Sequence, residues 1–300
     1  ITRVGVQDPY LLAKDGKWTI DKAIELSTSY NEDIDGVEGI GYKDKYGWAG
    51  QYDDMPSMIY GAGVKILSPD SEGWPSLTLY SDKSDQAVEK VLKLMLNTDY
   101  YISGNDLFGK TDTQWPMDAL QNAFIDGRVM FFSGGISSAI KFGKMEDTFG
   151  ILPVPKLTDD QDEYYSLLNT WTTNGYAIAL NNSLDDAEFA AAALEAMGYY
   201  SWSGLGLNTL SSLYYEKVLK NQKLTLEESS TMLDLIFKQR GCDLGSVFNI
   251  GKVSGQKTVN DLFGELISNK QSGVFRSSYD EIADSLKTDT DALIEYFKKG

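Results

Sequence analysis

Three phrases between residues 117 and 197 constrain the fold of this chain more than any other stretch. The first, MDALQNAFIDGRVMFF, predicts a helix with an apolar stripe and then a buried strand over 129–132. The second, TFGILPVPK, predicts a short strand over 149–151 that its two prolines stop. The third, NGYAIALNNSLDDAEFAAAALEAM, predicts a strand over 176–180 and a helix capped by Asn182-Ser183. Helices that alternate with short strands indicate an α/β layered architecture.

The net charge of this 300-residue chain limits the partners that its surface can bind. Its formal charge of -17 and its isoelectric point near 4.4 argue against nucleic-acid binding, because binding phosphates needs clustered lysine and arginine. The same acidic surface disfavours docking on anionic lipid. A hydrophobic fraction of 42% is ample for a packed core and indicates one large domain or two ordinary ones.

The chain contains no histidine, which narrows its chemistry. Ser-His-Asp and Cys-His catalysis are excluded, and so are most zinc sites. The single cysteine, Cys242, cannot build a disulfide framework, and its position after a predicted helix indicates a small buried residue.

Two motifs resemble ligand sites but fail in detail. Residues 104–111 match the phosphate-loop pattern G-x-x-x-x-G-K-[ST], yet the preceding segment is predicted as a helix, and Asp106 would place a negative charge in the cradle. Residues 31–36, which read Asn-x-Asp-x-Asp-Gly, match the first half of a calcium loop. The twelfth position of that loop is Tyr42, where a bidentate glutamate is required. We therefore predict neither an ATP site nor a metal site.

Paired carboxylates leave a glycan hydrolase open as an alternative. Asp53-Asp54 and Asp185-Asp186 are two such pairs. Hydrolysis needs carboxyl groups on both sides of the scissile bond, and sequence neighbours on a loop do not supply that geometry. Asp185 and Asp186 also fit the start of a helix, where the dipole favours anions. We predict no catalytic residue and no cofactor.

The order of these phrases resembles the extracellular solute-binding proteins of ABC importers, in the branch that mostly carries sugars and oligosaccharides. That family shares a helix ending aF..Gk.aM, a strand yg..plP and the phrase gyaI...s.....A..f. Residues 123–130 read AFIDGRVM here, with arginine where lysine is usual. DGKWTIDKAIELS near the start is similar to the family's GkWTwdkf.elak, and Tyr46-Gly47 follows as a YG segment. The resemblance covers nearly the whole chain.

The resemblance implies a type II periplasmic-binding-protein-like α/β fold with two lobes. Residues 1–172 and 213–300 would then form the C-terminal lobe, and residues 173–212 would belong to the N-terminal lobe. Members of the family normally carry a signal segment, a lipid-anchoring cysteine and most of a first lobe before the phrase at Trp18. We therefore expect a C-terminal piece of a longer extracellular lipoprotein that is tethered to the cell membrane.

Aromatic residues in polar or glycine-rich connections are candidate ligand contacts. Sugar rings stack their apolar C–H faces on aromatic planes, while their hydroxyls need fixed polar partners. In the family, residues near the YG segment and before the lobe crossing commonly face the ligand cleft. The candidates are Trp48, Gln51, Tyr52, Trp115, Trp171 and Thr172. The alternative for each tryptophan is simple packing in the core.

One departure from the family lies near these candidates. Many relatives carry a sugar-stacking tryptophan soon after the aF..GkaaM phrase, but this chain has Ser133-Gly134-Gly135 there. The glycines would let the backbone approach a ligand or would cap the next helix.

Together these features predict a monomeric, non-enzymatic protein that captures a sugar or oligosaccharide in a cleft between two lobes. It would deliver the sugar to an ABC permease in the membrane after hinge closure. A secreted glycan hydrolase that uses paired carboxylates, or a glycan-binding module without a transport role, are the alternatives. The sequence does not name the ligand, because a fold does not fix a function.

Overall fold

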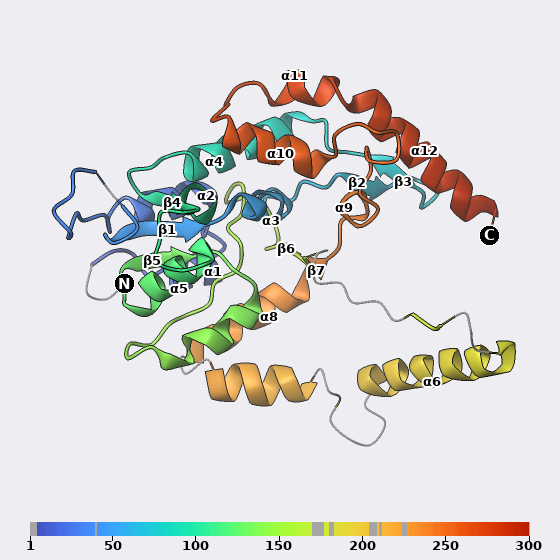
Figure 1. Cartoon of the computed structure of the whole chain (residues 1–300), viewed down its shortest axis with the longest axis horizontal. Coiled ribbons are helices and arrows are strands. Elements are labelled where there is room, and N and C mark those ends of the chain that lie inside the picture. The colour runs from blue at the N-terminus through green and yellow to red at the C-terminus, as the bar shows by residue number, and fades with distance from the viewer. Residues whose placement is uncertain are drawn as a thin grey trace.

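The computed structural model describes residues 5–39, 41–169, 177–179, 183–203, 209, 212–223 and 227–299. A three-stranded parallel sheet in the order β4-β1-β5 organises the fold (Figure 1). Two short strand pairs accompany it, β2 with β3 antiparallel and β6 with β7 parallel. The strands are β1 (Tyr46–Gly50), β2 (Leu67–Pro69), β3 (Pro75–Leu77), β4 (Tyr101–Ser103), β5 (Val129–Phe132), β6 (Ser166–Leu167) and β7 (Arg240–Gly241).

Helices connect these strands. In chain order they are α1 (Pro9–Lys14), α2 (Ile20–Ser27), η1 (Tyr52–Asp54), α3 (Met55–Gly61), α4 (Asp82–Met95), η2 (Gly104–Leu107), α5 (Pro116–Ile125), η3 (Ile136–Lys144), α6 (Leu184–Ser203), η5 (Leu213–Lys223), α8 (Glu227–Lys238), α9 (Leu244–Val247), α10 (Val259–Ser268), α11 (Phe275–Asp280) and α12 (Ala283–Lys299). The η elements are 3-10 helices, apart from η5, which is a π-helix.

The parallel sheet is buried between layers of helices. Every residue of β1 is buried, as expected for a central parallel strand. Trp48 and Phe131 belong to the main core with the apolar stripes of α2 and α4. Ala49 and Val129 belong to a second cluster with Leu120 of α5. The α/β layered architecture predicted from the sequence is confirmed.

Side-chain caps and apolar stripes form the helices that flank the sheet. The side chain of Thr19 accepts a hydrogen bond from the Lys22 amide at 3.3 Å and so begins α2. Ser81 does the same for α4 through the Ser84 amide at 3.1 Å. The α4 stripe of Val88, Val91, Leu92 and Met95 is buried.

Trp18 anchors the segment that follows the sheet. Its side chain is fully buried, and its Nε1 donates a hydrogen bond to the Pro153 carbonyl at 2.9 Å. The prediction of a strand over 149–151 is wrong, because this segment is extended but pairs with no named strand. Prolines 153 and 155 lack the N–H groups that a ladder needs, so only a single bridge forms, between Thr19 and Lys156.

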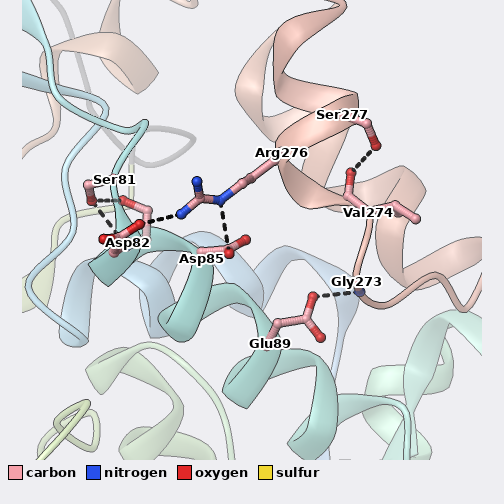
Figure 2. Close-up of polar contacts among 9 residues, drawn as sticks. Ser81, Asp82, Asp85, Glu89, Gly273, Val274, Arg276 and Ser277 are labelled. Atoms are coloured by element: carbon pink, nitrogen blue, oxygen red, sulfur yellow. Dashed lines mark hydrogen bonds and ion pairs between the residues drawn. The ribbon is translucent and has the colours of Figure 1, made fainter.

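The C-terminal helices pack back onto α4. The α10 stripe of Val259, Leu262, Phe263 and Leu266 is buried in the main core. Figure 2 shows how α11 is attached: the Arg276 guanidinium contacts the Asp82 carboxylate at 2.5 Å and the Asp85 carboxylate at 3.0 Å. The Gly273 amide also donates to Glu89 at 2.7 Å. These contacts hold segments from opposite ends of the chain together.

Cys242 is exposed, so the prediction that it is buried is wrong. It directly follows the short strand β7, and its neighbour Asp243 is the residue that turns inward. The Asp243 carboxylate accepts hydrogen bonds from the amides of Ile66 at 2.6 Å and Gly245 at 2.8 Å.

Helix α6 lies apart from the sheet and its covering helices (Figure 1). Ser183 caps it as predicted, since its Oγ accepts the Asp186 amide at 3.2 Å. None of the described side chains of α6 is buried, and its apolar residue Phe189 is 76% exposed. The strand predicted over 176–180 lies largely outside the described residues, and residues 177–179 are not in a strand. Within the described chain, no helix has the length and apolar character needed to cross a membrane.

Candidate functional site

The carboxyl ends of the parallel strands form the candidate site. β1 lies in the centre of the sheet, and the chain builds β4 on one side of it before crossing to build β5 on the other. In open α/β sheets, ligands bind outside the carboxyl ends of the strands where the strand order reverses. That reversal falls between β1 and β5 here. We call residues 51–54, 103–108 and 133–135, which follow the three strands, the carboxyl edge.

Tyr52 joins the turn after β1 to the turn after β4. Its amide donates to the Asn105 side-chain oxygen at 2.9 Å, and its phenol donates to the Asp106 carboxylate at 2.6 Å. Burial and this hydrogen bond raise the pKa of Tyr52 to about 12, so the phenol keeps its proton at neutral pH. Tyr52, Asn105 and Asp106 therefore form a fixed polar group along the edge.

Gln51 and Asp54 close a capping box in the same turn. The Gln51 amide donates to Oδ2 of Asp54 at 2.8 Å, and the Asp54 amide donates to the Gln51 carbonyl at 3.1 Å. Burial raises the pKa of Asp54 to about 7, with a further contribution from the neighbouring charge of Asp53. The conformation of the turn thus depends on a carboxyl group that titrates near neutral pH.

Trp48 lies beneath the carboxyl edge. Its ring is 5% exposed and packs against Phe131, with ring centroids 5.2 Å apart. Its Nε1 donates a hydrogen bond to Oγ of Ser133 at 2.8 Å. The sequence suggested Trp48 as a direct ligand contact, but the fold places its ring in the core, because β1 is covered on both faces. Trp48 supports the edge through Ser133.

Trp115 offers an exposed aromatic surface in the connection that begins at β4. Its ring is 59% exposed and meets Phe108 edge to face, with centroids 6.1 Å apart and an interplanar angle of 75°. Phe108 is itself 56% exposed. These two rings give the connection an apolar surface on which a ligand ring could stack.

The structure brings four of the predicted contact residues to this end of the sheet and adds others. Gln51 and Tyr52 lie on the edge, Trp48 lies below it, and Trp115 lies in the β4–α5 connection. Trp171 and Thr172 lie outside the described residues, so their contact role stays a prediction. Sequence reasoning missed Asp54, Tyr101, Asn105, Asp106 and Phe108 as members of the site. In the sequence, Phe108 precedes Gly109 and belongs to no apolar helix stripe, and this position could have marked it as a candidate contact.

The phosphate-loop pattern at residues 104–111 has a different role. A strand, β4, does precede it, so the expectation of a preceding helix is wrong. Its first residues form η2, while Lys110 and Thr111 lie in turns ahead of Pro116, where α5 begins. Phosphate binding needs the lysine and hydroxyl at a helix start, and that geometry is missing here. Asn105 and Asp106 instead bind Tyr52.

The acidic loop near residue 35 gathers three carboxylates. One oxygen each from Asp33, Asp35 and Asp44 lies within 4.8 Å of the others. Burial alone would raise the pKa of Asp44, but the amides of Gly41, Ile34 and Asp35 outweigh it and hold that pKa below its ordinary value. The Asp44 carboxylate thus already accepts hydrogen bonds from the backbone amides of the loop, and these bonds explain why it is buried.

Two surface hollows lie away from the carboxyl edge. One, of about 620 Å³, lies between α4 and α11 and is lined by charged side chains that include Asp82, Asp85 and Arg276. The other, of about 320 Å³, is lined by Lys65, Lys83 and short hydroxyl residues. In the first hollow, Arg276 already forms ion pairs with Asp82 and Asp85. Sugar sites combine aromatic and polar groups, which favours the edge over the first hollow.

Comparison with solved structures identifies the fold. A maltose/maltodextrin-binding domain from Bdellovibrio bacteriovorus bound to maltotriose matches with a TM-score of 0.57 and 15% identity, over 98% of this chain and 69% of that one. UgpB from Mycobacterium tuberculosis in complex with glycerophosphocholine matches with a TM-score of 0.57 and 14% identity, over 98% of this chain and 67% of that one. An ABC substrate-binding protein from Listeria monocytogenes in complex with cycloalternan matches with a TM-score of 0.55 and 11% identity, over 95% of this chain and 67% of that one. This chain has the fold of ABC substrate-binding proteins.

The type II fold predicted from the sequence is therefore confirmed. No family model matches the sequence, and a search of curated proteins finds no match either. At 11% to 15% identity these similarities establish the fold and not the ligand. The chain spans about two-thirds of the length of the substrate-binding proteins that it matches, from 67% to 69%.

Proposed function

We propose that this chain is the substrate-capturing part of an ABC importer and binds a sugar or oligosaccharide at the carboxyl edge. The observation that carries this proposal is the combination at the edge of exposed aromatic rings with a fixed polar group. Phe108 and Trp115 supply the rings. Tyr52, held by Asn105 and Asp106, supplies oriented polar atoms. Sugar sites need both, because a sugar has apolar faces and many hydroxyls.

The similar structures support the sugar class. Two of the three described above hold carbohydrate, maltotriose in one and cycloalternan in the other. The third holds glycerophosphocholine, so polar ligands of other kinds are accommodated by the same fold. We favour carbohydrate for this chain because aromatic rings lie on its edge and no lysine or arginine lies among residues 51–54, 103–108 and 133–135.

The proposed mechanism is hinge closure over the ligand. Residues 173–212 would belong to a second lobe, and α6 would pack there, which is consistent with the exposure of its apolar residues. A ligand that binds the closed form more tightly shifts the population toward it. The protein would be an extracellular lipoprotein and would deliver its ligand, chemically unchanged, to a membrane permease.

Calorimetry against a panel of oligosaccharides, with maltotriose and cyclic glucans included, tests the proposal. We expect saturable binding of at least one glycan and no change in that glycan after prolonged incubation. Release of shorter sugars would contradict the proposal and favour a hydrolase. Absence of binding across the panel would contradict the sugar assignment.

Two tryptophan variants locate the bound sugar. Trp115→Ala should weaken binding about tenfold, which corresponds to about 1.4 kcal/mol, because a stacking face is lost. Trp171→Ala should also weaken binding, with nearly unchanged thermal stability. Tyr296→Ala is the matched control, since this aromatic residue is 75% exposed on α12, outside the carboxyl edge. If the control weakens binding as much as Trp115→Ala, the edge is not the site.

A further inference from the structure

The hollow of about 320 Å³ beside the start of α4 differs in charge from the rest of this acidic chain. Lys65 and Lys83 line it together with Tyr165 and short hydroxyl residues, among them Ser81 and Ser84, and no carboxylate is part of the lining. We call it the lysine hollow. Its volume lies at the lower end of the range of small-molecule sites, about 300–1,000 Å³.

The two ammonium groups of the lysine hollow lie beside one pair of tyrosine rings. Nζ of Lys65 lies 5.7 Å from the centroid of the Tyr60 ring. Tyr60 meets Tyr165 edge to face, with ring centroids 6.4 Å apart. A Cβ placed on Gly63 would lie 2.7 Å from Nζ of Lys83 and 3.4 Å from Cε2 of Tyr165. Both lysines therefore belong to one hollow and not to separate parts of the surface.

Both lysines keep hydrogen-bond donors for a ligand. Nζ of Lys83 donates to the Gly63 carbonyl at 3.1 Å, which leaves two of its three N–H groups. Lys65 contacts the Tyr60 ring and, like Lys83, forms no ion pair with a carboxylate among the described residues. Two lysines without a carboxylate partner in one hollow of a chain with a net charge of -17 indicate a place for an anion.

The nearby carboxylates are engaged elsewhere. Asp82 and Asp85, in the first turn of α4, pair with Arg276 in the hollow between α4 and α11 (Figure 2). Asp160 has a pKa below its ordinary value, chiefly because it forms a hydrogen bond with the Thr158 side chain, with smaller contributions from Lys156 and Lys83. These carboxylates therefore do not take the place of a ligand in the lysine hollow.

The start of α4 adds to the positive field. Oγ of Ser81 accepts a hydrogen bond from the Ser84 amide at 3.1 Å and lies 2.7 Å from Oγ of Ser84. The first turn of a helix leaves amides without intrahelical partners, and the helix dipole favours an anion there. In this 14-residue helix the dipole acts together with the two lysines.

We propose that the lysine hollow binds the phosphate group of a small molecule. A phosphate monoester carries between about 1.5 and 2 negative charges at neutral pH, which matches two ammonium groups. Lys65 and Lys83 pair with its oxygens, and the Tyr165 hydroxyl supplies a further donor. The site is separate from the carboxyl edge, so it stands whether or not that edge binds a sugar.

Calorimetry with inorganic phosphate and with methyl phosphate, a small phosphate monoester, tests the proposal. Sodium chloride keeps the ionic strength constant, because screening by salt weakens contacts between exposed charges. We expect saturable binding with a dissociation constant on the order of 1 mM. Equal affinities would show that the oxyanion itself is recognised, and tighter binding of methyl phosphate would show that the ester group also contacts the hollow. Absence of saturable binding of both probes would overturn the proposal.

Three lysine variants locate the bound phosphate. Lys65→Gln and Lys83→Gln should each weaken binding about tenfold, because each removes a charge-assisted contact. Both side chains are exposed, so thermal stability should be nearly unchanged. Lys93→Gln is the matched control, since it removes the same charge from an exposed position of α4 outside the hollow. An equal loss of affinity in Lys93→Gln would overturn the proposal, because the anion would then respond to net charge alone.

Backbone amide signals in nuclear magnetic resonance give a second measurement that does not depend on any variant. Inorganic phosphate should shift the amide signals of Gly63 and of residues 81–84 along one saturable curve. Shifts confined to other parts of the chain would contradict the assignment to the lysine hollow.

Discussion

At the end of β1, one glycine allows the half-buried Asp54 and the buried Tyr101 to approach each other. Gly50 has no side chain, and Asp54 and Tyr101 fill the space that a Cβ would take. Gly50 is needed for this close approach and not for an unusual backbone conformation, because its backbone is not in the left-handed region. The geometry of the carboxyl edge therefore depends on a residue that has no side chain of its own.

Gly50→Ala should destabilise the protein and disturb the edge. The added methyl group would lie 2.5 Å from Oδ2 of Asp54 and 2.7 Å from the Tyr101 hydroxyl, which forces both to move. Overpacking of this kind costs about 1–3 kcal/mol, to be measured by urea unfolding. Gly198→Ala on α6 is the control, because a Cβ there meets nothing within 4 Å, and it should be neutral or stabilising. Equal effects of the two substitutions would contradict the crowding at Gly50.

Asp54 should also make stability depend on pH in a characteristic direction. Its pKa is about 7 in the folded protein and 3.8 for an unperturbed carboxyl. As pH rises from about 4 to about 7, the unfolded chain loses this proton first, so the free energy of unfolding should fall relative to Asp54→Asn. The expected loss is on the order of 2–4 kcal/mol, reduced by the partial exposure of the residue. Urea unfolding at several pH values measures it, and a constant difference between the two proteins would refute the shift.

Among the elements, α6 differs most from the others. Its sequence has the pattern of a packed helix, yet its large apolar residues, such as Phe189 and Trp202, are exposed in the structure. A helix with this much exposed apolar surface needs a partner surface, which the proposal of a second lobe supplies. Helices α2, α4 and α10 show the opposite, with their apolar stripes buried in the main core.

Phe189→Ser should therefore leave the stability of this chain nearly unchanged, within about 0.5 kcal/mol, because its side chain is 76% exposed. Phe263→Ala on α10 is the comparison, where a side chain that is 2% exposed is removed at a cost of about 3–5 kcal/mol. Thermal and urea unfolding measure both. A large loss in Phe189→Ser would show that α6 is packed within this chain.

Helix stripes could be predicted from the sequence because they depend on local spacing. Val88, Val91, Leu92 and Met95 repeat with the helical period, and all are buried. Trp48 could not be placed in the same way, since its burial depends on neighbours from β4 and β5 that pair on either side of it. The segment over 149–151 misled the prediction because its apolar residues pack without joining a ladder.

For the whole molecule, several family phrases in the right order predicted the fold correctly, although no single phrase decided it. The site was predictable only in part. Gln51 and Tyr52 follow a recognisable segment, whereas Asp54 and Tyr101 meet only after β1 and β4 pair. Because strand pairing over a long sequence distance brings such residues together, the local spacing of residues in the sequence does not predict them.

For the whole molecule, the proposed sugar site lies where the three parallel strands end. Hydrogen–deuterium exchange with the tightest-binding glycan of the calorimetric panel, maltotriose among the candidates, tests it most directly. We expect slower exchange at residues 51–54, 103–108 and 133–135 once the glycan saturates the protein. Protection confined to the charged hollow along α4 and α11, or none at the carboxyl edge, would contradict it.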